Sequence, residues 1–135
     1  MKLQKTSVFL MVILAVVTLG LYIPYWFLEK KNVFNSLSKN KLSHELAYFV
    51  FVIYFIHIMW AITNIFSPLN TFIYLFFSSV IGFFASVAGL ISIVLGFEVR
   101  KILLVHFGNK KKISKIWTFL FSPYYLQYKI NKGIK

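Results

Sequence analysis

The side chains that could carry acid–base chemistry in this chain are few. It has three Glu, three His, no Asp and no Cys. A Ser-His-Asp triad, a thiol nucleophile and a thiolate metal site are therefore excluded, and no glycine-rich phosphate loop is present. The carboxylates and two of the imidazoles all flank the apolar segments, at Glu29, Glu45, Glu98, His44 and His106. No ligand spacing supports a metal site, so we expect interfacial salt bridges, no catalytic or metal residue and no cofactor.

His57 and Asn64 are the polar residues that stand out within an apolar segment, two helical turns apart on one face. Polar and ionisable groups inside a membrane are candidates for proton relays or ligand sites. The alternative is a neutral histidine that hydrogen-bonds across a helix interface, to Ser78, Ser79 or Ser86. We favour this structural role, because the apolar segments offer no carboxylate with which His57 could exchange a proton.

The elements that position these residues follow from two long stretches without formal charge, at 6–28 and 46–97. A helix of about 20 apolar residues crosses a bilayer core. We therefore predict a single all-α integral membrane domain over 1–135, with three transmembrane helices at about 7–28, 46–66 and 71–97. The first is longer than the apolar core of a signal peptide, so we expect it to be retained.

A fourth apolar stretch is too short to span a bilayer. It contains Pro123 and is preceded by a lysine cluster, so we predict a short interfacial C-terminal helix at about 113–128. Its positive charge is expected to bind an anionic lipid bilayer, rather than nucleic acid, although the formal net charge of the chain is +12. The predicted lipid-binding residues are Lys110, Lys111, Lys112, Lys115 and Trp117.

Positive charge predicts the orientation. All but two of the fifteen Lys and Arg residues lie in the loop 29–45 or the tail 98–135. The positive-inside rule makes that side cytoplasmic, in a plasma (inner) membrane, and three spans then place the N-terminus outside. The alternative is a re-entrant first segment, since Gly20 and Pro24 interrupt its final third and Lys2 and Lys5 would then also face the cytoplasm.

The segment 71–97 carries a seam of small residues at alternating steps of four and three. Such faces allow helix backbones to approach closely in lipid, so the seam predicts a packing face. The segment 46–66 of the same chain is the favoured partner, and another subunit is the alternative. The seam consists of Ser78, Gly82, Ala85, Gly89, Ser92 and Gly96.

Two motifs resemble the bacterial family called domain of unknown function 4234. The first segment ends in the family's Thr-x-Gly-x-Tyr-x-x-Tyr-Trp pattern, and the tail matches a Tyr-Leu-Gln-x-x-Ile-Asn stretch at 125–131. Pro24 departs from the pattern, because similar sequences often have Gly there. The resemblance implies a small inner-membrane protein and supplies no activity. The motif residues are Thr18, Gly20, Tyr22, Tyr25, Trp26, Gln127 and Asn131.

Gly20 and Pro24 should free backbone carbonyls that Gln127 and Asn131 could satisfy, so we predict that the two ends of the chain meet. The leading functional hypothesis is a non-enzymatic membrane protein that binds another membrane protein, itself or lipid, for example in immunity to a membrane-active peptide. A channel or transporter subunit with His57 near the pathway is the alternative. A lipid enzyme would need one of the three glutamates.

Overall fold

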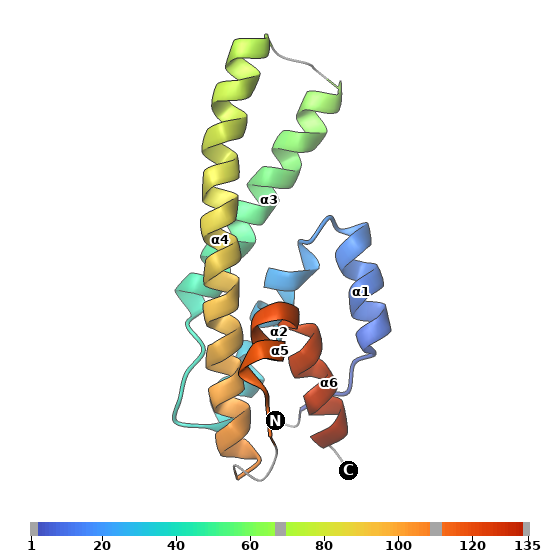
Figure 1. Ribbon diagram of the computed structural model, residues 1–135, viewed down its shortest axis with the longest axis vertical. Coiled ribbons are helices and arrows are strands. Elements are labelled where there is room, and N and C mark those ends of the chain that lie inside the picture. Colours follow the sequence, from blue (N-terminus) through green and yellow to red (C-terminus); the bar gives the residue numbers. More distant parts are fainter. Residues whose placement is uncertain (1–2, 67–69, 109–111, 134–135) are drawn as a thin grey trace.

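The structure is a computed structural model that describes residues 3–66, 70–108 and 112–133. These residues form helices and no strand, so the predicted all-α class is confirmed. Two long helices make a hairpin, and the shorter helices gather around its lower half, where both ends of the described chain lie (Figure 1). The helices are α1 (Val8–Val17), α2 (Tyr22–Leu37), α3 (His44–Phe66), α4 (Thr71–His106), α5 (Lys115–Phe121) and α6 (Tyr124–Gly133).

In the part of the chain that the structure describes, α3 and α4 are the two helices long and apolar enough to cross a membrane, as predicted for 46–66 and 71–97. Asn70 caps the start of α4, because its side chain accepts a hydrogen bond from the Phe72 amide. The predicted end of α4 at Phe97 is wrong. The helix continues to His106 because Val99, Ile102 and Leu103 are buried against the other helices.

The predicted unbroken helix over 7–28 is wrong, and the chain folds back between α1 and α2 (Figure 1). Gly20 adopts φ +91°, a left-handed conformation that ends α1. The Thr18 hydroxyl stabilises the turn, because it donates to the Leu14 carbonyl at 2.7 Å and accepts from the Tyr22 amide at 3.0 Å. α1 has 10 residues, about 15 Å at 1.5 Å per residue, which is half the thickness of a bilayer core.

Pro24 does not break a helix, contrary to expectation. It lies in the first turn of α2, where no intrahelical partner for its missing N–H is needed. The predicted loop from Glu29 is also shorter than expected, since α2 continues to Leu37 and buries Phe34. The connection to α3 is therefore confined to residues 38–43.

The predicted single helix over 113–128 is wrong as well. Ser122 is extended, as the residue before a proline prefers, and it separates α5 from α6. The apolar side of α5 points outward, since Ile116 and Trp117 are 70% and 53% exposed. Thr118 is fully buried instead. α5 therefore packs its polar side on the protein and leaves its apolar side uncovered.

The hydrophobic core lies in the lower half of the molecule, where α2, α4 and α6 meet. Trp26, Phe27 and Leu126 are completely buried there. The hairpin above it has almost no such cover, because only 11% of the most apolar window of α3 and 17% of that of α4 are buried. The most apolar helices are thus the least enclosed ones.

The corner between α5 and α6 approaches α4 at Gly96. A Cβ on Gly96 would lie 2.8 Å from the Ser122 Cβ and would overlap the Ser122 Oγ. Real Cβ atoms do not approach each other this closely, so this contact requires a residue without a side chain.

We expect Gly96→Ala to lower the free energy of unfolding by about 1–3 kcal/mol, the usual cost of overpacking a filled site. Gly82→Ala is the matched control, because a Cβ on Gly82 meets nothing within 4 Å. Alanine should leave that position unchanged or up to about 1 kcal/mol more stable. Thermal unfolding in detergent, followed by tryptophan fluorescence, measures both. Equal shifts in the two variants would contradict the close contact at Gly96.

Candidate functional site

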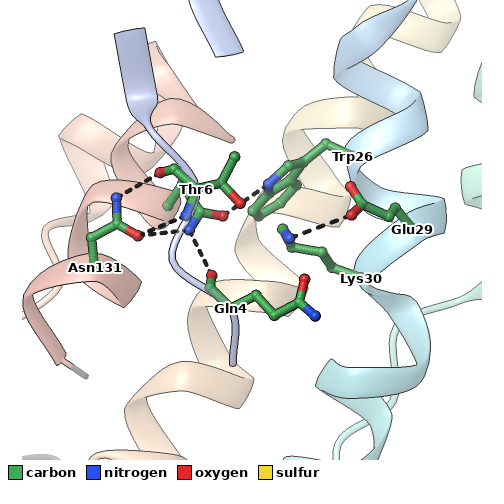
Figure 2. Close-up of polar contacts among 7 residues, drawn as sticks. Gln4, Thr6, Trp26, Glu29, Lys30 and Asn131 are labelled. Carbon is green, nitrogen blue, oxygen red and sulfur yellow. Dashed lines mark hydrogen bonds and ion pairs between the residues drawn. The ribbon is translucent and has the colours of Figure 1, made fainter. Parts of the chain in front are cut away.

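The two ends of the chain meet where Gln4 and Thr6 lie beside Asn131 (Figure 2). The buried side chain of Gln127 on α6 joins them. Its Nε2 donates to the Gln4 carbonyl at 3.2 Å and to Asn131 Oδ1 at 2.9 Å. Its Oε1 accepts from the Trp26 indole N–H at 3.1 Å. One amide therefore joins α2, α6 and residues 3–7, a non-helical segment that belongs to no β-sheet in the described chain and that we call the N-terminal strand.

Asn131, one turn further along α6, binds the same strand. Its Nδ2 donates to the Thr6 carbonyl at 2.7 Å, and its Oδ1 accepts from the Thr6 amide at 3.3 Å. We call these five residues, Gln4, Thr6, Trp26, Gln127 and Asn131, the terminal network. The two side-chain amides hold the strand as an adjacent β-strand would, by pairing with its backbone.

The prediction that the chain ends meet is confirmed, but the predicted bonding partners are wrong. Gln127 and Asn131 bind backbone carbonyls ahead of α1 rather than those freed at its end. The freed carbonyls are satisfied locally, since the Leu21 amide donates to the Thr18 carbonyl at 3.0 Å and the Ile23 amide to that of Gly20 at 3.1 Å.

The aromatic residues of the first motif differ in their burial. Trp26 packs edge-on against Phe27 with ring centroids 5.2 Å apart. Burial raises the pKa of Tyr22 above its ordinary value, and the nearby Glu29 charge raises it further. Burial also raises the pKa of Tyr124. Both phenols therefore stay neutral and pack against the core. Tyr25 is largely exposed.

The three glutamates lie at the charged end of the bundle but share no site. Glu98 Oε2 accepts from the Ser43 amide at 3.2 Å, and Glu45 Oε2 accepts from the Ser43 hydroxyl at 3.2 Å. Glu29 lies 3.7 Å from the Lys30 ammonium. The expected salt bridges of Glu45 and Glu98 are replaced by these bonds, because the connection before α3 presents its own donors. Among the described residues, no three His, Asp or Glu side chains gather as metal ligands.

The small-residue seam on α4 faces two different neighbours. Ser78 and Gly89 face α3, where Ser78 Oγ accepts from Trp60 and a Cβ on Gly89 would lie 3.8 Å from the Tyr54 hydroxyl. Gly96 faces the α5–α6 corner instead. Gly82 has open space in front of it. Ala85 is half-buried, and Ser92 is half-buried with its hydroxyl bonded to the Ala88 carbonyl.

His57 and Asn64 line an open groove of about 660 Å³ between α3 and α4, which we call the hairpin groove. The predicted bond from His57 to a serine is wrong. The Trp60 indole N–H donates to Ser78 Oγ at 3.0 Å, and the Ser79 and Ser86 hydroxyls donate to backbone carbonyls of their own helix. The Asn64 Nδ2 donates to the Trp60 carbonyl, and its buried Oδ1 has no partner within the described residues. Sequence reasoning missed Trp60, whose signal is an indole donor inside an apolar helix.

The basic tail lies beside the exposed face of α5. Lys112 and Lys115 are exposed, and Trp117 stacks on Phe121 with ring centroids 5.4 Å apart. Lys110 and Lys111 lie outside the described residues. Positive charge and an outward apolar face thus occur together, which is the arrangement that interfacial lipid binding requires.

No family model, curated protein or solved structure matches this chain. The resemblance of the two motifs therefore stays a prediction. A proposal about function has to rest mainly on the geometry of the structure.

We expect Gln127→Met to destabilise the fold by about 1–3 kcal/mol, because the buried Trp26 N–H loses its acceptor. Trp26→Phe in the same chain removes the stranded donor, so the double variant should be destabilised by less than the sum of the single changes. Denaturant unfolding of the three variants in detergent tests this coupling. Strict additivity would mean that the hydrogen bond contributes nothing specific.

Proposed function

We propose that the chain is a small, non-enzymatic integral membrane protein that acts through contacts with lipid and with another membrane protein or itself. One observation carries this proposal: the apolar faces of α3 and α4 lack protein cover. Apolar surface is stable when it is out of water, so a bilayer is the environment that suits these faces. The most exposed apolar side chains include Ile65, Phe66, Phe72, Phe83 and Leu90.

In the proposed topology, α3 and α4 span the bilayer, while α1 and α2 form a re-entrant hairpin. Support comes from the short length of α1 and from its exposed Phe9, Val16 and Val17. α5 would lie at the interface with Ile116 and Trp117 in lipid. This topology replaces three spans, because a folded-back first segment returns the N-terminal strand to the end where α6 lies.

The same topology assigns the charged end to the cytoplasm of a plasma membrane. The tip of the hairpin at Asn70 carries no charged side chain, whereas the opposite end carries Lys5, Lys31, Arg100 and Lys115. Such asymmetry is what the positive-inside rule describes. The N-terminus is then cytoplasmic, together with the loop and the tail.

A role without catalysis is supported by the occupation of the acidic groups. Two of the three carboxylates are engaged, because oxygens of Glu45 and Glu98 accept bonds from Ser43. Partner binding or protection of the membrane, such as immunity to a membrane-active peptide, needs only exposed helix faces and a basic surface. The motif resemblance to a small bacterial inner-membrane family agrees with this proposal.

A second candidate is a subunit of an oligomeric channel or transporter. The hairpin groove favours it, because His57 is exposed there and Asn64 Oδ1 is an unsatisfied acceptor. A water-filled path between subunits would satisfy both groups.

The topology is tested by single-cysteine labelling with a membrane-impermeant maleimide, since the native chain has no Cys background. Asn70→Cys should react in intact cells. Lys5→Cys, Ser36→Cys and Lys112→Cys should react only after permeabilisation. Reaction of Lys5→Cys in intact cells would restore three spans. Complete extraction of the protein by alkaline carbonate would contradict membrane integration altogether.

The activity is tested by expression in a strain that is sensitive to a membrane-active peptide, together with ion flux in liposomes. We expect peptide tolerance or an in-cell crosslinked membrane partner, with no flux. A flux that His57→Leu abolishes, and that the exposed Thr63→Val on the same helix leaves intact, would replace the interaction role by the transport role. Absence of tolerance, partner and flux together would contradict both.

A further inference from the structure

Lys30 is a charged residue that the fold encloses with one distant partner among the described residues. It lies on α2, one turn after Trp26, and its side chain is only 8% exposed. Its ammonium lies 3.7 Å from Glu29 Oε1, beyond hydrogen-bonding distance, and it forms no hydrogen bond with the described residues. Consecutive helical residues do not face each other, so Glu29 reaches this position from the side.

A buried ammonium with one distant partner is unfavourable. It has three N–H donors, and removal of a charge from water carries a large desolvation cost unless close acceptors replace the hydration. The Glu29 side chain is 39% exposed and supplies one of these interactions. The remaining donors call for an acceptor that the described chain does not provide.

Lys30 lines a cavity of about 230 Å³, which we call the Lys30 pocket. Its lining consists of Leu3, Gln4, Glu29, Lys30 and Val33. One wall is α2 and the other is the N-terminal strand, as the positions of Gln4 and Lys30 in Figure 2 show. The strand is fixed by the bonds of Thr6 and Gln4 to α6, so the pocket has a built wall.

The pocket presents two opposite charges side by side. Lys30 would attract an inorganic anion, but the Glu29 carboxylate would repel it. Glu29 would attract a simple cation, but the Lys30 ammonium would repel it. A ligand with a phosphate and an ammonium a few atoms apart matches both. The pocket also lies at the charged end of the bundle, which in the proposed topology is the level of the lipid headgroups.

We propose that the Lys30 pocket binds the zwitterionic headgroup of a phospholipid of the ethanolamine type. The phosphate oxygens accept from the Lys30 ammonium and the Gln4 side-chain amide, and the headgroup ammonium donates to Glu29. Leu3 and Val33 contact the apolar part of the glycerol region. This inference rests on the proposed membrane location, but it names a lipid class and a site that the location alone does not require.

The test uses the full chain, purified in detergent and titrated with phosphatidylethanolamine or phosphatidylglycerol of identical acyl chains. Native mass spectrometry counts the bound lipids. We expect one site that prefers phosphatidylethanolamine at least tenfold. Lys30→Gln and Glu29→Gln should each weaken that site about tenfold or more and reduce the preference. Lys31→Gln is the matched control, because Lys31 is the next lysine on α2 and does not line the pocket.

Several results would overturn the proposal. Equal weakening by Lys31→Gln would mean general surface electrostatics. Equal binding of phosphatidylglycerol, unchanged in Glu29→Gln, would mean a simple anion site, and competition by millimolar inorganic phosphate would then identify free phosphate as the ligand. If Lys30→Gln does not fold, Glu29→Gln decides the question alone, because that side chain is partly exposed. Binding in detergent is read independently of topology, so failure here differs from failure of cysteine labelling.

Discussion

The buried amide of Gln127 is the interaction on which the lower half of the molecule depends. An amide in the interior is stable only when its donors and acceptor are all used, and Gln127 achieves this with Trp26, Gln4 and Asn131. These partners lie on three separate segments. α2, α6 and the N-terminal strand must therefore take fixed positions together, and the small core around Trp26 and Leu126 fills the space that they enclose.

The long hairpin could be predicted from the sequence, because a long stretch without charged residues indicates an apolar helix whatever its packing partners are. An interruption of the first helix at Gly20 could be predicted, but the reversal of the chain there could not. The reversal needs both the left-handed glycine and the hydrogen bonds of the Thr18 hydroxyl. The uncovered apolar side of α5 could be predicted from the sequence. The end of α5 at Ser122 and the close packing of Ser122 against Gly96 could not. Those depend on a close approach between segments far apart in the sequence.

The candidate sites divide in the same way. Gln127 and Asn131 could be identified because a motif resemblance directed attention to them, although their backbone partners are Gln4 and Thr6 rather than the residues at the end of α1. Lys30 could not be identified, since a lysine beside another lysine at the end of an apolar segment normally belongs to a solvated loop. The N-terminal strand forms the other wall of its pocket, and the spacing of residues in the sequence does not show this approach. A buried polar site such as this one depends on contacts between distant segments, which sequence spacing alone does not predict.

The terminal network also has a consequence for how the protein forms. The bonds between Thr6 and Asn131 join residues 125 positions apart, so they close only after residue 131 has been synthesised. The contacts between α3 and α4 are closer in sequence, so this hairpin can form earlier. Folding should therefore proceed in two stages, with the α3–α4 hairpin first and closure of the terminal network last. Until that closure, the first thirty residues remain unfastened and accessible to chaperones or proteases.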